Sequence, residues 1–234
     1  MLLEGYGAQL WNGTIETIIL SLLSLLLAFV IGLIGASAKL SSNRWFSIPA
    51  QIYTTVIRGI PDLVLLLLLF YSFQDYLNQL TDALNQPQID IDPFLAGVAV
   101  LGFIYGAYFT ETIRGAVLAV PKGQLEAGAA YGLTTWQIFR RILFPQMMRF
   151  ALPGISNNWQ VILKATAIVS IIGLHDVVKA AQEAIAGTIS KGAYHAFLFL
   201  LVTALIYLLL TTISHVIFVF LEKRYSIGVR RSDL

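Results

Sequence analysis

The sequence contains no cysteine, and only 12% of its 234 residues are charged. The lack of cysteine excludes disulfides, thiolate nucleophiles and thiolate metal ligands. A soluble domain usually carries about 25% charged residues, whereas 57% of the residues here are hydrophobic. The shortage of charge therefore argues against a soluble globular protein and favours a chain embedded in a lipid bilayer.

Sequence signatures of nucleotide and metal binding are also missing. No Gly-x-x-x-x-Gly-Lys-Ser/Thr segment occurs, so the chain has no phosphate-binding loop with which to hold ATP. The three histidines, His175, His195 and His215, are each 20 residues apart, which is not the close spacing of a metal site. We therefore expect the chain itself to bind no cofactor and no metal.

Five apolar segments predict the membrane spans, because a helix needs about 20 residues to cross the hydrocarbon core. They are Thr17–Ala38, Leu63–Gln74 with its flanks, Pro93–Thr110, Phe150–Leu174 and Gly192–Leu221. Core helices of a soluble protein would be shorter and would carry polar faces. The first run is too long for a cleavable signal peptide, so we expect it to remain as a span. The predicted fold is an all-α membrane protein with five transmembrane helices in one domain, residues 1–234.

The distribution of Lys and Arg predicts the orientation, because positive residues concentrate on the cytoplasmic side. With the N-terminus outside, the inner segments are 39–47, 114–149 and 222–234, and the outer segments are 1–13, 81–92 and 175–191. The inner segments hold eleven positive residues, whereas the outer ones hold only Lys179 and Lys191. This asymmetry predicts an N-out, C-in topology. Since the basic residues share one side, nucleic-acid binding is not expected.

Three features between or within the spans leave room for interpretation. Trp45–Ile57 is either an interfacial helix or the inner extension of a long second helix kinked at Pro61. Asn78–Pro93, rich in Asn, Gln, Asp and Pro, is predicted to be an outer loop. Small residues permit close helix contact, within the chain or between two chains. The candidates are Gly32, Gly35, Gly102 and Gly106.

The stretch Glu126–Pro145 differs from its apolar surroundings and predicts two short helices. Pro121 and Gly123 end the third span, and a helix starting near Gln124 would place Glu126 in its first turn, where the helix dipole favours an acid. Gly132 suits the left-handed residue that ends a helix. The sequence then predicts a second helix that is capped at its start and stopped by Pro145; its capping box pairs Thr134 with Gln137.

This segment also combines a helix surface of small Ala and Gly side chains with basic side chains. Arg140 and Arg141 lie beside an apolar stripe made of Ile138, Phe139, Ile142 and Leu143. A short helix of Ala and Gly fits closely into a groove on another protein, which favours a docking surface for a soluble partner. The alternative is a loop on the membrane surface with its arginines on lipid phosphates. The residues alone favour neither role over the other.

Several ionisable residues lie in or near the spans, where charge is costly and usually paired. Arg58 and Asp62 are four residues apart, and Glu111 and Arg114 are three apart, so each pair fits one helix face. Lys164 lies about 21 Å into the fourth span at 1.5 Å per residue. These groups either line or gate a translocation path, or form structural ion pairs.

The central segment resembles the signature of ABC importer permeases, which reads Glu-Ala-Ala, three residues, Gly, nine residues, Ile, one residue and Leu-Pro. The corresponding residues here are Glu126-Ala127-Gly128, Gly132, Ile142 and Phe144-Pro145. Gly128 and Phe144 depart from the usual Ala and Leu, and both substitutions keep the geometry plausible.

Further motifs resemble the polar amino acid branch of this family. They are Arg58-Gly59-Ile60-Pro61, Ala107–Gly115, Val120–Gln124, and Leu152-Pro153 followed by Asn157, Lys164, Thr166 and Asp176. Four more stretches are similar to the Q-type permease subunits of importers for histidine and basic amino acids. These are Pro61–Leu63, Gln88–Pro93, Gly154–Gln160 and Glu222–Leu234.

The resemblance implies a type I importer permease in the bacterial inner membrane. It would act with a second, similar permease, a dimeric ATPase that holds ATP and magnesium, and a periplasmic amino acid-binding protein. Coupling to the ATPase would then fall on eight residues: Glu126, Ala127, Gly128, Gly132, Arg140, Arg141, Ile142 and Pro145. The substrate path or gate would involve Arg58, Asp62, Glu111, Arg114, Lys164 and Thr166.

Other functions and substrates remain alternatives. A self-sufficient secondary transporter would need inverted repeats or more spans, and an intramembrane enzyme would need facing catalytic residues; the sequence indicates neither. The substrate could also be another polar amino acid. In many members of the family that this chain resembles, an Asp follows the Lys of the fourth span. Here Lys164 is followed by Ala165. We hypothesise that the partner permease supplies most contacts to the substrate side chain, with Thr166 or Glu111 lining the path here.

Overall fold

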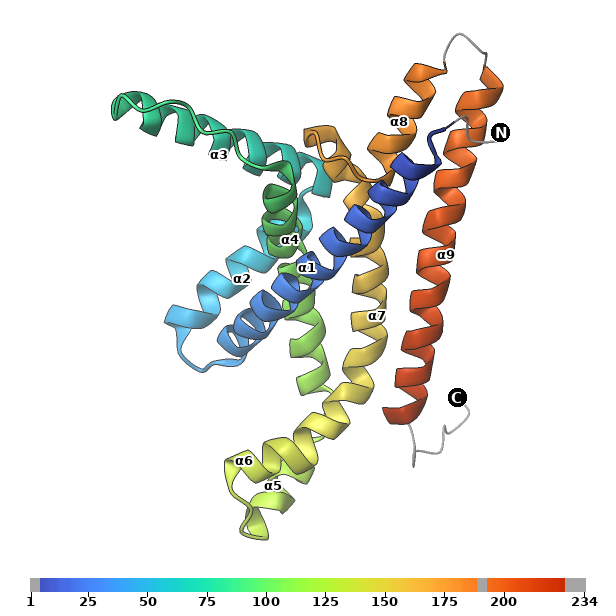
Figure 1. Ribbon diagram of the computed structural model, residues 1–234. Helices are drawn as coiled ribbons and strands as arrows, with labels where there is room; N and C mark the ends of the chain where they lie inside the picture. Colours follow the sequence, from blue (N-terminus) through green and yellow to red (C-terminus); the bar gives the residue numbers. More distant parts are fainter. Residues whose placement is uncertain (1–4, 189–192, 226–234) are drawn as a thin grey trace.

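The computed structural model describes residues 5–188 and 193–225, and the regular structure in these ranges is helical (Figure 1). Lys191, Arg230 and Arg231, which contributed to the predicted orientation, lie outside the described residues. The helices are α1 (Gly7–Leu40), α2 (Arg44–Gly59), α3 (Asp62–Ala83), α4 (Pro93–Leu118), α5 (Lys122–Ala130), α6 (Thr135–Ile138), the π-helix η1 (Phe139–Leu143), α7 (Phe144–Val169), the 3-10 helix η2 (Ser170–Ile172), α8 (Val177–Gly187) and α9 (Ala193–Tyr225).

Four of these helices, α1, α3, α4 and α9, are long and apolar enough to cross a membrane. A fifth candidate is a bent pair, in which Thr135–Ile172 and Val177–Gly187 meet at 50°. The bend follows Gly173, whose φ of 101° is left-handed, a conformation that suits glycine. The predicted number of five spans therefore fits if the bent pair is one span. The predicted outer segment 175–191 contains the helix α8.

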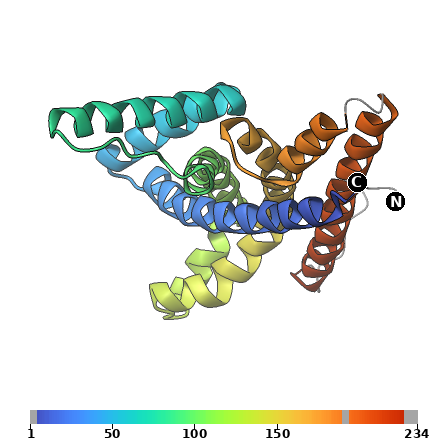
Figure 2. The ribbon, with the colours of Figure 1, turned by 45° about the horizontal axis from the view of Figure 1, so that its top comes forward.

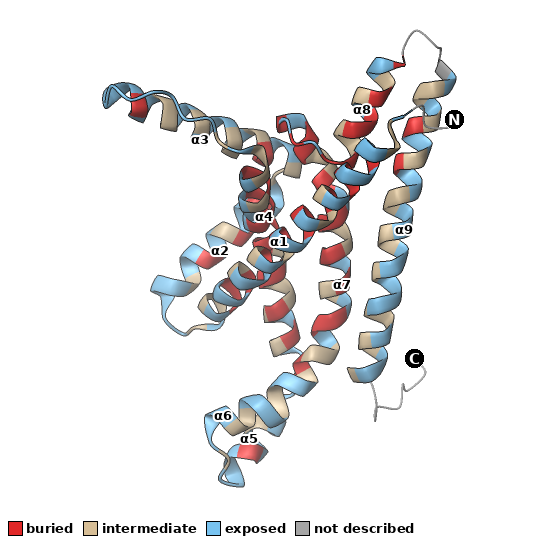
Figure 3. Cartoon of the chain, viewed as in Figure 1, coloured by how far each residue is buried: buried red, intermediate tan, exposed pale blue. Residues whose placement is uncertain are grey.

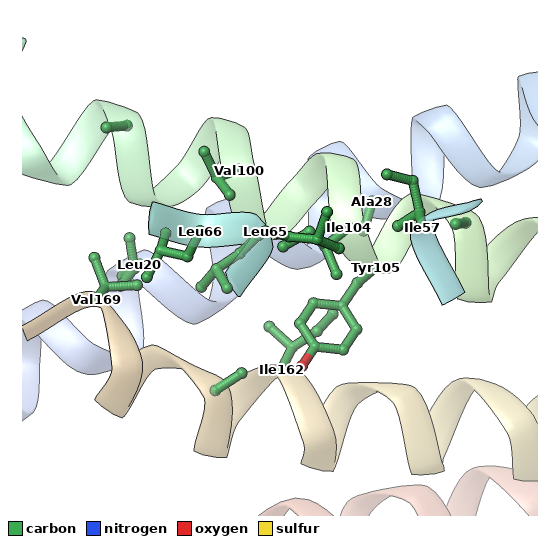
Figure 4. Close-up of a cluster of buried hydrophobic side chains, with 14 of the residues drawn as sticks. Leu20, Ala28, Ile57, Leu65, Leu66, Val100, Ile104, Tyr105, Ile162 and Val169 are labelled. Carbon is green, nitrogen blue, oxygen red and sulfur yellow. The ribbon is translucent and has the colours of Figure 1, made fainter. Parts of the chain in front are cut away.

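The apolar core lies around α4. Figure 3 shows the buried residues concentrated on α4, α7 and one side of α1, whereas α3 and α9 are largely exposed or intermediate. The main cluster joins residues from α1, α2, α3, α4 and α7 (Figure 4). Those labelled in the figure are Leu20, Ala28, Ile57, Leu65, Leu66, Val100, Ile104, Tyr105, Ile162 and Val169. The exposed apolar faces of α3 and α9 are as expected for surfaces in contact with lipid or another membrane subunit.

Reciprocal glycines bring α1 and α4 together over the most extensive helix contact in the structure. A Cβ atom at Gly102 would lie 2.5 Å from Leu27 Cδ2, and one at Gly106 would lie 2.6 Å from Ile31 Cγ2. Facing them, Gly32 and Gly35 of α1 leave room for Phe109 and Thr110 of α4. The four small residues therefore serve contact within the chain, which was one of the two uses that the sequence allowed.

Overpacking this contact is expected to destabilise the protein. Gly106→Leu should cost about 1–3 kcal/mol, because the added side chain has to displace Ile31 or separate the helices. Gly115→Leu on the same helix is the matched control, since a Cβ there meets nothing within 4 Å. Thermal unfolding of the purified protein in detergent measures the effect. Equal losses of stability in both variants would contradict the proposed packing.

The predicted second span, Leu63–Gln74, lies within α3, and the segment Trp45–Ile57 before it lies in the separate helix α2 (Figure 2). The alternative of one long helix kinked at Pro61 is therefore wrong, because Ile60 and Pro61 are extended at ψ of 140° and 135°. Asn43 begins α2 by accepting a hydrogen bond from the Trp45 amide at 3.0 Å.

The predicted outer loop is shorter than the sequence indicated, because α3 continues to Ala83. Residues 78–83 are therefore helical instead of belonging to a loop from Asn78 to Pro93. Gln74 of α3 fixes the returning chain. Its side-chain nitrogen donates to the Ile89 carbonyl, and its oxygen accepts from the Ile91 amide, both at 2.8 Å.

Candidate functional site

The coupling segment, residues 121–149, projects from the ends of α4 and α7 (Figure 1). The predicted end of its first helix is confirmed: Gly132 has φ of 80°, Leu133 donates to Gly128 at 3.1 Å, and Gly132 donates to Ala129 at 2.9 Å. These two bonds form a Schellman motif, which satisfies the last carbonyls of α5. The start was predicted wrongly. Because α5 begins at Lys122, Glu126 lies beyond its first turn.

The second helix of the coupling segment has the predicted capping box. Gln137 N donates to Thr134 Oγ1 at 3.3 Å, and Thr134 N donates to Gln137 Oε1 at 2.9 Å. Pro145 does not stop this helix, as the sequence had suggested. The π-helix η1 leads directly into α7, whose second residue is Pro145, so the helical path continues through the proline. A helix thus connects Thr135 to Val169 without a break.

Two signature residues hold the coupling segment together. Gly128 is buried, and a Cβ atom there would lie 2.6 Å from Ile142 Cδ1, so glycine permits α5 to approach η1 closely. The same segment is joined to the spans by a buried cluster that includes Val120, Met147 and Ala151, with Leu125 packed against it. Movement of the coupling segment is therefore tied by packing to α4 and α7.

The outer surface of the coupling segment is open. Glu126, Ala127, Arg140, Arg141 and Pro145 are all exposed. Two exposed aromatic residues were missed by the sequence analysis: Tyr131 is 89% exposed and Trp136 is 66% exposed. Exposed aromatic side chains are typical of protein contact surfaces. Their position beside the helix-ending Gly132 and the Thr134 cap was the signal that could have identified them.

A second candidate site is a polar pocket of about 370 Å³ between α2 and α4, beside the end of α1. Gln51, Thr54, Thr55 and Arg58 recur at helical spacing, so they share one face of α2. The complete lining is Lys39, Gln51, Thr54, Thr55, Arg58, Gly59, Tyr108, Glu111 and Arg114. Three residues predicted for a path or gate, Arg58, Glu111 and Arg114, are thus brought together.

Glu111 is the centre of a three-residue ion cluster in this pocket. The predicted pairing with Arg114 is confirmed, since both Nε and a terminal nitrogen of Arg114 donate to Oε2, at 3.0 and 2.9 Å. Lys39, which sequence reasoning assigned to an inner loop, donates to the other oxygen, Oε1, and lies 2.9 Å from Thr54 Oγ1. The side chains of Lys39, Glu111 and Arg114 are 8%, 18% and 34% exposed.

The prediction that Arg58 and Asp62 share one helix face is wrong, because the helix is interrupted at Ile60 and Pro61 and the two residues lie on different helices. Asp62 accepts a hydrogen bond from the Tyr105 hydroxyl at 2.7 Å. The Arg58 guanidinium lies over the Tyr108 ring, 5.3 Å from its centre. In the ranges 5–188 and 193–225, Arg58 forms no ion pair with a carboxylate.

The two remaining candidates of the path lie on α7, away from this pocket. Lys164 is exposed on the surface of the chain. Thr166 is fully buried, donates to the Leu163 carbonyl at 2.8 Å and lies 3.3 Å from the Tyr207 hydroxyl of α9. Their roles in transport stay predictions. Among the described residues, no cluster of three His, Asp or Glu side chains has the geometry of a metal site.

Comparison with known proteins identifies the family. The model of the family described as "binding-protein-dependent transport system inner membrane component" matches residues 28–227. The chain belongs to this family. It is therefore a permease component of an ABC transport system, and its apolar helices agree with a protein that crosses the membrane several times.

Similar proteins cover the whole chain. The histidine/lysine/arginine/ornithine transport system permease protein HisQ of Escherichia coli (strain K12) is 56% identical over 233 residues, 100% of both chains. The octopine transport system permease protein OccQ of Rhizobium radiobacter is 36% identical, covering 97% of this chain and 94% of that protein. The crystal structure of an amino acid ABC transporter with histidines has a TM-score of 0.75 and 32% identity, covering 94% and 95% of the two chains.

Proposed function

We propose that the chain is one permease subunit of an ATP-driven importer of histidine and other basic amino acids in the bacterial inner membrane. The observation that carries this proposal is the 56% identity, over the full length of both chains, with a permease for histidine, lysine, arginine and ornithine. The 36% identity with an octopine permease makes another polar amino acid the alternative substrate.

The coupling segment would contact a dimeric ATPase on the cytoplasmic side, and a second permease would complete the path. The exposed Glu126, Ala127, Arg140 and Arg141, with Tyr131 and Trp136, form a surface suited to such a partner. Gly132 would set the turn, whereas Gly128 and Ile142 would hold the two short helices together. In this arrangement the N-terminus would lie outside and the C-terminus inside. A periplasmic binding protein would deliver the substrate.

The polar pocket would line or gate the inner half of the path. Its charged residues lie near the ends of α1 and α4 that lead towards the cytoplasmic side in this orientation. Binding of substrate and nucleotide would bias the spans between inward- and outward-open arrangements. Asp62, Lys164 and Thr166 remain proposed members of the path, and the second permease would contact most of the substrate side chain.

The chain purified alone is expected neither to hydrolyse ATP nor to accumulate histidine. The reason is that it has no phosphate-binding loop. Phosphate release and uptake of radiolabelled histidine into proteoliposomes measure the two activities. The matched control is the complex with its second permease and ATPase, supplied with ATP and binding protein. Accumulation by the single chain would overturn the proposal, and uptake of a different polar amino acid by the complex would correct the substrate.

A further inference from the structure

The polar pocket carries more positive charge than the described residues around it neutralise. Lys39, Arg58 and Arg114 are cations, whereas Glu111 is the only carboxylate among the lining residues. Lys39 and Arg114 already occupy the two oxygens of Glu111. The pocket therefore has a net formal charge of two positive units, and Arg58 is left without an ion pair in the described ranges. A cleft lined mainly by charge of one sign attracts ligands of the opposite sign, so the unpaired guanidinium favours an anionic group.

The other lining residues indicate what kind of anion fits. They are Gln51, Thr54, Thr55, Gly59 and Tyr108, and none has an aliphatic side chain. A phospholipid needs an apolar surface for its acyl chains beside the basic residues that bind its headgroup. A small polar solute instead needs hydrogen-bonding groups in a cavity of its own size, and about 370 Å³ lies within the range of small-ligand sites. The lining thus favours a small zwitterionic or anionic solute.

We propose that this pocket binds the α-carboxylate of the transported amino acid, with the Arg58 guanidinium as its principal partner. The proposal rests on the proposed function. It gives this chain the role of recognising the α-carboxylate, which all amino acid substrates share. The Tyr108 ring positions the guanidinium from one face, which leaves its planar edge available for two parallel hydrogen bonds to a carboxylate. Glu111 does not repel the ligand, because Lys39 and Arg114 neutralise it.

The position of the pocket makes it a late binding site on the path. Lys39 is one residue from the end of α1, and Arg114 is four residues from the end of α4, which leads into the coupling segment. A carboxylate held here would leave the amino acid side chain free to contact the second permease. The pocket would then accept basic amino acids of different length, because recognition at this point does not depend on the side chain.

The test compares histidine with histidinamide, which keeps the imidazole and the amino group but lacks the carboxylate. The assembled complex of both permeases and the ATPase is placed in lipid nanodiscs without binding protein, and equilibrium binding of both compounds is measured. The native complex should prefer histidine. Arg58→Gln should weaken histidine binding by about tenfold or more, since it removes a charge-assisted hydrogen-bond pair, and should leave histidinamide binding nearly unchanged. The preference should therefore disappear.

Matched variants separate the carboxylate site from other effects. Arg44→Gln removes a cation from the other end of α2, outside the pocket, and should keep the native preference. Arg58→Lys keeps the charge without the planar fork and should give an intermediate preference. If Arg58→Gln does not assemble, Tyr108→Leu removes the ring that positions the guanidinium and should reduce the preference instead.

The outcomes distinguish this proposal from the proposed function. An unchanged preference in Arg58→Gln, or in Tyr108→Leu if the first variant does not assemble, overturns the carboxylate site. In that case, normal uptake of histidine by the native importer leaves the proposed function standing. If the native complex, supplied with binding protein and ATP, takes up no basic amino acid, the proposed function itself is wrong.

Discussion

Replacing Gly132 by Trp is expected to abolish ATP-driven uptake while leaving membrane insertion largely intact. Gly132 has φ of 80°, where most side chains cost about 1–2 kcal/mol. A Cβ atom there meets nothing within 4 Å, so the indole would project from the surface proposed to contact the ATPase. Strain in the turn and bulk on the surface should together prevent the ATPase from binding. Co-purification with the ATPase and uptake into proteoliposomes measure both effects.

Matched substitutions separate the causes of this loss. Gly132→Asn tolerates the left-handed conformation and adds little bulk, so it should keep most of the uptake. Glu126→Lys reverses an exposed charge without affecting the turn and should also weaken binding of the ATPase. Its effect should decrease as salt is added, because exposed charges are screened. Normal co-purification and normal uptake in both Gly132→Trp and Glu126→Lys would show that the docking surface lies elsewhere.

Glu111→Gln is expected to be the most destabilising single neutralisation in the polar pocket. It removes the shared partner of two cations, and Lys39 is only 8% exposed. Removing one member of a buried pair costs about 3–5 kcal/mol, largely because the remaining charge is left uncompensated. Thermal unfolding in detergent and uptake by the assembled importer should both decrease.

Double replacement identifies the dominant partner of Glu111. Lys39→Met combined with Glu111→Gln should recover part of the lost stability, since the more deeply buried of the two cations is then removed together with its partner. Arg114→Met with Glu111→Gln should recover less, because Arg114 is 34% exposed and better solvated when it is unpaired. Effects that simply add in both double variants would argue against pairing and for separately solvated groups.

The sequence predicted features that depend on residues close together in the chain. The left-handed Gly132, the box between Thr134 and Gln137, and the pair Glu111–Arg114 each depend on contacts within three to five residues. The role of these residues in coupling or transport remains a prediction. Lys39 escaped notice as a partner because it is 72 residues from Glu111, and no local spacing connects them.

Two errors have the same origin in the path of the backbone. Spacing placed Arg58 and Asp62 on one helix, but the extended Ile60 and Pro61 redirect the chain between them. Pro145 was read as a helix stop, whereas the π-helix before it lets the chain continue into α7. Charge spacing and proline position are reliable only once the continuity of the helix is known, and packing decides this.

The continuous helix from Thr135 to Val169 can transmit motion over a long distance. Its 35 residues extend about 50 Å at 1.5 Å per residue, from the exposed second helix of the coupling segment to the far side of the core. A rotation of about 10° around one end would displace the other by roughly 9 Å over that length. Modest tilting by a partner at one surface of the membrane would thus become a displacement wider than an amino acid side chain near the other.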